Sequence, residues 1–403
     1  MTPDWRDVAR RRMQPTYAVP DVVFVRGHGC TLIDDRGEEW LDLLAGIAVT
    51  SLGHAHPAVT AAVTDQVATL VHTSNLFLTT PALALMERLA GLLAWDDARF
   101  FMAQCGATAN EAAIKLARRH GLAQRPGKHR VVALEGSFHG RTLATLELTG
   151  QSAKRAPFEP LAGFVDHVPH DDPEALLAAV GPETCAVVLE VVQGEGGVRP
   201  VPPAVLAAAR EACDRHGALL WFDEVQTGVG RTGTWFAFQG TDVRPDVVTL
   251  AKGLGTGLPI GLCVARGAAA TALAPGQHGT TFGGNPVTSA AALAVLDTIE
   301  REGLLAAAVA RAGQFRLGLA DIAARTGAIR EVRGVGLLLG VVLHAPSAAA
   351  VEAARRAGRV IVNAVAPDVI RLTPPLTITP TEVARALEVL DAALASVGTE
   401  DPS

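Results

Sequence analysis

Continuous apolar runs, each followed by a glycine-rich or polar turn, recur between residues 98 and 265. Most are rich in Val and Leu, and they span residues 99–102, 131–134, 186–189, 218–222 and 247–250. Strands that helices cover on both faces have this pattern, because neither face meets water. A helical segment from Ala107 to Arg119 follows the first run. This repeated alternation predicts an α/β chain built on a large, mostly parallel sheet.

The C-terminal part of the chain has a different pattern. Apolar runs at residues 335–343 and 369–372 predict strands beside helices, and therefore a smaller α+β unit. The last helix is predicted to begin at Pro380, because Thr379 and Glu382 are spaced as a capping box. Its apolar stripe has a helical period and consists of Val383, Leu387, Leu390, Leu394 and Val397.

Length and charge exclude several classes of protein. The chain has 403 residues, of which 49% are hydrophobic, so it can fill the cores of two or three domains. No apolar stretch approaches the ~18–20 residues of a membrane span, and the first residues lack the apolar core of a signal peptide. The net charge is −6 and no basic run stands out. We therefore expect a cytoplasmic protein that binds neither membrane nor nucleic acid.

Cysteine and histidine spacing gives no support for a disulfide framework or a metal site. The five cysteines are far apart and form no C-x-x-C pair: Cys30, Cys105, Cys185, Cys213 and Cys263. They are predicted to be reduced thiols. His54 and His56 have H-x-H spacing, but no third ligand is evident nearby and Pro57 follows at once. We interpret this segment as a turn and expect no metal.

Two charged residues follow predicted strands and are candidates for chemistry. Asp223 ends the apolar run at 218–222, and ligands of open α/β sheets bind outside the carboxyl ends of strands. Lys252 follows the run at 247–250 and enters a glycine-rich turn, where burial would lower its pKa and make it a Schiff-base nucleophile. The other three lysines lie in polar surroundings. Taken alone, Asp223 could equally be a helix or turn cap, and the position of Lys252 is more typical of a surface lysine beside a turn.

Three further loops follow predicted strands. The segment from Gln104 to Glu111 enters a helix whose N-terminus could hold a phosphate. Residues 137–141 bring an aromatic face and a guanidinium, and residues 193–197 place an acid in a flexible loop. An acid, a lysine, an aromatic ring and a phosphate-binding turn at one sheet edge together predict a pyridoxal 5′-phosphate (PLP) site. Gly228–Gly233 matches G-x-G-x-x-G, but it neither follows its strand directly nor opens a helix, which argues against a dinucleotide site.

At these residues the sequence resembles the class III, or ω-amino, aminotransferases of PLP fold type I. The stretch from Asp223-Glu224-Val225-Gln226 to Lys252 is highly specific for that class, and softer matches such as residues 138–141 and 281–286 are similar to its acetylornithine subgroup. The resemblance covers nearly the whole chain. It implies a large sheet domain (61–305) and a smaller α+β domain that the two chain ends form together (1–60 with 306–403).

The resemblance also assigns roles around the cofactor. It implies that Lys252 binds the cofactor as a Schiff base and moves the proton, while Asp223 keeps the pyridine nitrogen protonated. Phe138 and Val225 would cover the two ring faces, and Gln226 would lie near the phenolic oxygen. The phosphate would be held at Cys105, Gly106 and Ala107. Thr281 would reach the phosphate of a neighbouring subunit, which implies a homodimer with shared active sites.

Substrate roles follow from the same resemblance. Arg141 is implied to bind the carboxylate distal to the reacting amine, and Arg371 the α-carboxylate of glutamate. Glu195 would pair with Arg371 when the amino substrate has no carboxylate there, so that no buried charge is left unpaired. Tyr17 and Asn75 stand where the family has substrate-lining residues. The implied reaction transfers the δ-amine of N-acetylornithine to 2-oxoglutarate, a step of arginine biosynthesis.

Some positions depart from the family pattern, and alternatives stay open. Cys105 replaces a serine and Thr108 a glutamate beside the phosphate, so we expect weaker cofactor binding. Thr256 stands where the family often has glycine. Another ω-amine, such as ornithine, succinylornithine or 4-aminobutyrate, could be the substrate. A non-catalytic protein of the same fold is a further alternative, but it should have lost Lys252 or Asp223.

Overall fold

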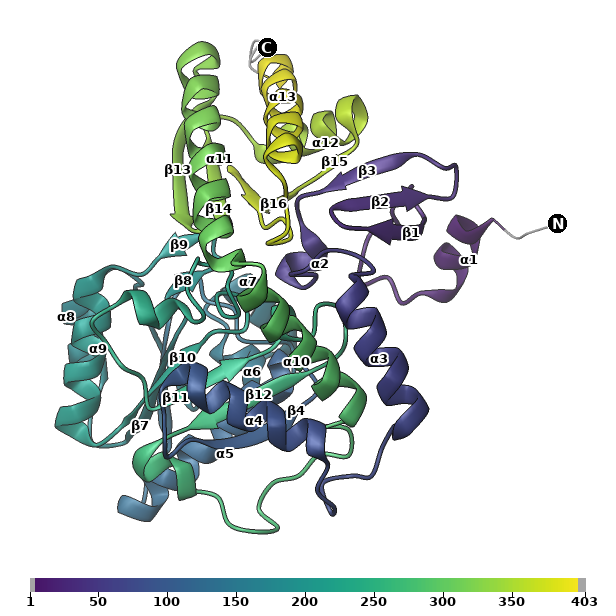
Figure 1. Cartoon of the computed structure of the whole chain (residues 1–403). Helices are drawn as coiled ribbons and strands as arrows, with labels where there is room; N and C mark the ends of the chain where they lie inside the picture. Colours follow the sequence, from purple (N-terminus) through teal and green to yellow (C-terminus); the bar gives the residue numbers. More distant parts are fainter. Residues whose placement is uncertain (1–3, 398–403) are drawn as a thin grey trace.

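A seven-stranded sheet lies at the centre of the chain, whose residues 4–397 are described by a computed structural model (Figure 1). Its strand order is β4-β12-β11-β10-β7-β5-β6, with bounds β4 Arg99–Ala103, β12 Gly261–Ala265, β11 Val247–Leu250, β10 Leu219–Asp223, β7 Thr184–Leu189, β5 Arg130–Leu134 and β6 Val165–Val168. Strand β12 runs opposite to the other six strands of this sheet. The mostly parallel sheet and all five strands expected from the apolar runs are confirmed, whereas β6 and β12 were not predicted.

Helices cover both faces of this sheet, as the continuous apolar runs required. Alternate strand residues enter two separate cores: Val132 and Phe222 belong to one, Val131 and Trp221 to the other. Helix α5 (Gly106–Gln124) packs in the second core. Helices α4 (Thr80–Leu93), α9 (Pro203–His216) and α10 (Pro286–Arg301) contribute to the first.

The two chain ends meet in a second region, in the upper part of Figure 1. Strands β1 (Phe24–His28), β2 (Thr31–Asp34) and β3 (Glu39–Asp42) are joined by β15 (Val360–Ile361), which pairs with β3 in parallel. A four-stranded sheet of order β13-β14-β17-β16 lies beside them, with bounds β13 Ile329–Val335, β14 Leu338–Leu343, β17 Val369–Leu372 and β16 Asn363–Ala366. The domain boundaries near residues 60 and 305 stay a prediction.

The remaining elements are short connections and the helices of the chain ends. Their bounds are α1 Trp5–Arg12, α2 Ala45–Ala48, α3 Pro57–Thr69, α6 Leu143–Leu148, α7 Ser152–Arg155, α8 Pro173–Ala179, α11 Leu304–Thr326, α12 Ser347–Gly358, α13 Pro380–Val397, β8 Val192–Gln193 and β9 Arg199–Pro200, with 3-10 turns η1 Ala156–Phe158, η2 Ala237–Gly240, η3 Lys252–Leu254 and η4 Gly267–Thr271. Within residues 4–397, no helix combines the length and apolarity needed to cross a membrane.

Helix α13 begins with the expected capping box. The Thr379 backbone N–H donates to Glu382 Oε2 at 2.8 Å, and the Glu382 N–H donates to Thr379 Oγ1 at 3.2 Å. Val383, Leu390 and Leu394 of the predicted stripe are buried, and Leu387 packs against the same core. The side chain of Val397 lies outside the described residues.

The apolar run at residues 335–343 is not one strand, contrary to its appearance in the sequence. It contains the end of β13, a turn at Gly336 and strand β14. Gly336 has a φ of 55°, and a Cβ there would lie 2.5 Å from the carbonyl carbon of Thr232. The turn therefore packs against the 231–232 loop, and Leu337 is buried in it. A buried turn carries apolar residues, so no polar signal marked it.

Candidate active site

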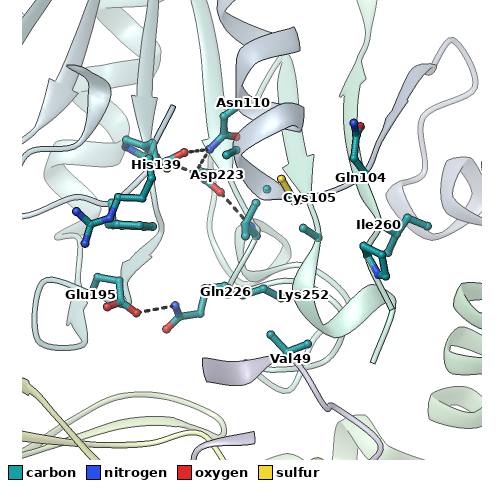
Figure 2. A pocket seen from close by; sticks show the side chains of 18 of the residues that line it. Val49, Gln104, Cys105, Asn110, His139, Glu195, Asp223, Gln226, Lys252 and Ile260 are labelled. Atoms are coloured by element: carbon teal, nitrogen blue, oxygen red, sulfur yellow. Dashed lines mark hydrogen bonds and ion pairs between the residues drawn. The ribbon is translucent and has the colours of Figure 1, made fainter. Parts of the chain in front are cut away.

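A cavity of about 440 Å³ opens at the carboxyl ends of β4, β5, β7, β10 and β11 (Figure 2). Parallel strands bring their following loops to the same edge of a sheet, which is where the sequence placed its candidates. Ten of the fourteen predicted site residues line the cavity: Cys105, Gly106, Ala107, Phe138, Arg141, Glu195, Asp223, Val225, Gln226 and Lys252.

Asp223 is fixed at the inner wall by three partners. Its Oδ2 accepts a hydrogen bond from Asn110 Nδ2 at 2.8 Å and lies 2.7 Å from His139 Nδ1. Its Oδ1 accepts from the Val225 backbone N–H at 3.1 Å. The residue is only 3% exposed. Three donors around this buried carboxylate fix its orientation, which a partner of a protonated ring nitrogen needs.

Lys252 enters the cavity from the turn that follows β11. Its φ of 43° lies in the left-handed region, which costs a non-glycine residue on the order of 1–3 kcal/mol, a strain that many active sites contain. Burial lowers the pKa of its amine, partly opposed by Glu195, while Arg371 lowers it further. A lowered pKa raises the fraction of neutral amine, the form that attacks a carbonyl carbon.

The amino end of α5 forms another wall. Cys105 is the N-cap, and Thr108 Oγ1 accepts from the Cys105 backbone N–H at 3.1 Å. Thr108, which replaces the glutamate expected at this position, therefore caps the helix through its hydroxyl. N–H groups of a first helical turn have no partner within the helix, so those of Gly106 and Ala107 can receive a phosphate. A Cβ on Gly106 would lie 2.8 Å from Val225 Cγ1, so this close approach requires glycine.

Glu195, Arg371 and Gln226 form a charged group at the opposite side of the cavity. Arg371 Nη1 forms an ion pair with Glu195 Oε1 and also donates to Gln226 Oε1 at 3.2 Å. Gln226 Nε2 lies 3.5 Å from Glu195 Oε1, an interaction drawn in Figure 2. Burial tends to raise the pKa of Glu195, but the charges of Arg371 and Lys252 outweigh it and lower that pKa. The expected ion pair forms, and its role as a switch stays a prediction.

Three predicted residues lie away from the cavity. Tyr17 is 78% exposed. Asn75 donates from Nδ2 to the Gly283 carbonyl at 2.9 Å, and Thr281 is exposed on the same loop region. None of the three lines the cavity of this chain. Their predicted contributions need either a second subunit or a bound substrate.

Three residues that line the cavity and position its other side chains or loops were not predicted from the sequence: Asn110, His139 and Glu190. Asn110 and His139 hold Asp223, and Asn110 Nδ2 also donates to the His139 carbonyl at 2.7 Å. Glu190 accepts from the backbone N–H groups of Phe138 at 2.9 Å and Gly194 at 3.0 Å, so it joins two cavity loops. A usable signal existed for Glu190, because it directly follows the apolar run at 186–189.

Glu190 gives the folded state a pH dependence. Burial raises the pKa of its carboxyl to about 7, from 4.5 for an ordinary glutamate. Between these values the folded chain binds a proton that the unfolded chain has lost, so stability falls as the pH rises. We expect Glu190→Gln, which is neutral throughout, to abolish this fall. Relative to the wild type it should gain about 2–3 kcal/mol in free energy of unfolding between pH 4.5 and pH 8.

Urea unfolding at pH 5 and pH 8 measures this difference. Glu183→Gln removes an exposed carboxylate outside the cavity and is the matched control. Its unfolding free energy should follow that of the wild type at both values. If the unfolding free energies of the Glu190→Gln variant and the wild type differ by the same amount at pH 5 and pH 8, Glu190 is already ionised at pH 5.

Comparison with known proteins defines the class. The family model described as aminotransferase class-III matches residues 13–394. The chain therefore belongs to the class-III aminotransferases, which are PLP-dependent enzymes.

The relatives described below are aminotransferases that carry the names of particular substrates. The chain is similar to an acetylornithine aminotransferase of Mycolicibacterium smegmatis, with 53% identity over 95% of this chain and 96% of the relative. It is 52% identical to an acetylornithine aminotransferase of Streptomyces coelicolor, over 90% and 88% of the two chains. Among solved structures, N-acetylornithine aminotransferase from Stenotrophomonas maltophilia matches with a TM-score of 0.84 and 36% identity, covering 97% of this chain and 98% of that one. An ornithine aminotransferase from Toxoplasma gondii matches with a TM-score of 0.92 and 32% identity, covering 98% and 95%.

The cavity fits pyridoxal phosphate. Its walls bring together a buried oriented carboxylate, a lysine of lowered pKa and the free amino end of a long helix. These match the three polar parts of the cofactor, namely the ring nitrogen, the aldehyde and the phosphate. No group of three or more His, Cys, Asp or Glu side chains suited to a metal was found within residues 4–397.

Proposed function

We propose that this chain transfers the δ-amine of N-acetylornithine to 2-oxoglutarate, giving N-acetylglutamate 5-semialdehyde and glutamate in arginine biosynthesis. The observation that carries the proposal is the ion pair between Arg371 and Glu195 in a cavity that also holds Lys252 and Arg141. One cavity can then accept an ω-amine and an α-amino acid in turn. The names of the relatives at about 50% identity support the choice of N-acetylornithine.

The two half-reactions need different charges at Arg371. When the carbon that bears the reacting amine has no carboxylate, Glu195 stays paired with Arg371, so the buried guanidinium remains neutralised. Glutamate brings its own α-carboxylate, which displaces Glu195 from Arg371. Without this exchange one substrate would leave an unpaired buried charge, at a cost of about 3–5 kcal/mol.

The other residues bind, orient and move a proton. Bound pyridoxal phosphate supplies a ring that accepts the electrons of the breaking C–H bond. Asp223 holds a proton at the ring nitrogen, and the amine of Lys252 takes a proton from the amine-bearing carbon of the substrate. Phe138 and Val225 exclude water from the ring faces, and Arg141 orients the substrate by its distal carboxylate.

Spectral titration of the cofactor-loaded protein tests the substrate. Without an oxo acid only the first half-reaction can run, so the yellow colour of the Lys252-bound cofactor should bleach on addition of N-acetylornithine. Bleaching at low N-acetylornithine, and only at much higher ornithine or 4-aminobutyrate, is the expected result. Bleaching only with another ω-amine would retain the aminotransferase and reject this substrate.

Ornithine transfer is the second candidate. It is supported by the similarity to the ornithine aminotransferase of Toxoplasma gondii, at 32% identity over 98% of this chain. The same titration, with ornithine in place of N-acetylornithine, decides between the two. A non-catalytic role is disfavoured, because Lys252 and Asp223 are both present in the cavity.

We further propose a homodimer with shared active sites in the cytoplasm, where free thiols persist. Leu76, Phe77, Leu78 and Phe282 are exposed on loops that the Asn75–Gly283 hydrogen bond joins. A cluster of exposed apolar side chains indicates a protein interface. Thr281 lies on this surface and would reach the phosphate bound to the second subunit.

Mixed dimers test this arrangement. Lys252→Ala and Thr281→Asp should each be nearly inactive alone, the second because its carboxylate repels the partner's phosphate. A mixed dimer contains one site with both native residues, so refolding the two variants together should restore activity. Light scattering should give twice the mass of the chain. No recovery in a confirmed mixed dimer would place Thr281 outside the partner's site.

A further inference from the structure

A second cation accompanies Arg141 at the Phe138 ring, although Lys154 itself is not among the residues that line the cavity. The Phe138 ring, which lines the cavity, has the Arg141 guanidinium carbon 5.6 Å and the Lys154 Nζ 5.3 Å from its centroid. Both contacts are within the range of cation–π attraction. Lys154 belongs to the short helix α7, which helix α6 separates from the loop that bears Phe138 and Arg141. One aromatic ring of the cavity wall therefore holds two positive charges.

Lys154 is electrostatically part of the site. Burial lowers the pKa of its amine, the charge of Glu195 opposes this, and Arg141 and Arg371 lower the pKa further. Its amine donates to Gln151 Oε1, which uses one of three N–H groups. The two charges repel each other, and an anion that both could reach would relieve this repulsion. The arrangement is therefore suited to a carboxylate that both cations can reach.

We propose that Lys154 is a specificity-determining residue, which forms with Arg141 a two-cation receptor for the distal carboxylate and disfavours substrates with a free ammonium group beside it. The inference rests on the proposed transaminase function and deepens it. The carboxylate distal to the reacting δ-amine is attached to the α-carbon in both N-acetylornithine and ornithine. In ornithine that carbon also bears an ammonium group, whereas in N-acetylornithine it bears a neutral amide.

The discrimination follows from charge alone. A single guanidinium can pair with the carboxylate of ornithine while the ammonium group faces away. A second cation on the other side of the carboxylate brings one positive charge close to the ammonium group in any orientation. Acetylation removes that charge, and the carboxylate can then accept from both residues. The γ-carboxylate of 2-oxoglutarate is likewise free of a neighbouring cation and should use the same receptor.

Selectivity measurements on purified, cofactor-loaded variants test the proposal. We expect Lys154→Met to raise the ratio of kcat/KM for ornithine over N-acetylornithine roughly fivefold or more, the scale of one partly exposed charge contact. The KM values for N-acetylornithine and 2-oxoglutarate should both rise while kcat changes little. Lys154→Arg, which keeps the charge, should retain the wild-type ratio. Arg118→Met removes a comparable cation–π contact, to Phe164 and outside the cavity, and should leave all constants unchanged.

The outcomes distinguish a failure of the two-cation receptor from a failure of the proposed transaminase function. An unchanged selectivity ratio in Lys154→Met would overturn the receptor, even with full activity on N-acetylornithine. An equal loss of kcat on every substrate would also overturn it, because it would indicate a structural role. If Lys154→Met does not fold, Lys154→Gln removes the same charge with a polar side chain, and an unchanged ratio there would overturn the receptor as well. Failure of the wild type to turn over N-acetylornithine would reject the proposed function instead.

Discussion

Replacing Lys252 by alanine should lower kcat by at least about 10³-fold, because the variant loses both the amine that binds the cofactor and the group that moves the proton. No other lysine lines the cavity formed by the described residues, so none can substitute for it. The fold should persist, since the lost side chain ends in an amine whose charged form is disfavoured by burial. Steady-state turnover and the visible spectrum of the cofactor-loaded protein measure the two losses.

Lys115→Ala is the matched control. Lys115 is an exposed lysine on α5 whose Nζ donates to the Gln277 carbonyl at 2.7 Å, outside the cavity. This variant should retain the wild-type turnover and colour. Turnover of the Lys252→Ala variant near the wild-type value would show that the amine is dispensable, and would contradict the assignment.

The sequence was most informative where the backbone geometry is regular. Strands with both faces covered must read as apolar runs, so β5, β7, β10 and β11 could be located without a structure. Parallel strands place their following loops at one edge, which is why Asp223 and Lys252 line one cavity although 28 positions separate them in the sequence. Strand β12 is as buried and apolar as the others, but it begins inside a glycine-rich segment that was interpreted as a turn.

Side-chain contacts between distant segments could not be predicted in this way. Asn110 and His139 reach Asp223 only because α5 and the loop after β5 converge on the end of β10. Lys154 looked like a surface lysine in a polar segment, since nothing in its neighbours indicates the Phe138 ring. Local chemistry can also compensate for an unusual residue. Thr256 adopts a φ of 41°, where the family often has glycine, and its Oγ1 accepts from the Leu52 N–H at 3.1 Å.

Asp223→Asn should lower kcat on the order of 10²–10³-fold, the effect of removing one preorganised electrostatic partner. The amide has the shape of the carboxylate but no charge, so it cannot keep a proton at the ring nitrogen. Asn110 Nδ2, His139 Nδ1 and the Val225 N–H all point at this side chain. An amide has one oxygen, so at least one of them loses its acceptor. We expect a loss of about 1–3 kcal/mol in free energy of unfolding as well.

Glu224→Gln separates the two effects, because Glu224 is the neighbouring buried carboxylate and lies outside the cavity. Its oxygens accept from the Ala237 and Phe238 N–H groups at 3.0 and 2.9 Å. Exchange for glutamine therefore costs a similar ~1–3 kcal/mol of stability but should leave kcat unchanged. Steady-state kinetics give kcat, and urea unfolding gives the free energy of unfolding, for both variants. Equal losses of kcat would mean that Asp223 acts through stability alone, whereas a loss confined to Asp223→Asn assigns the charge to the chemistry.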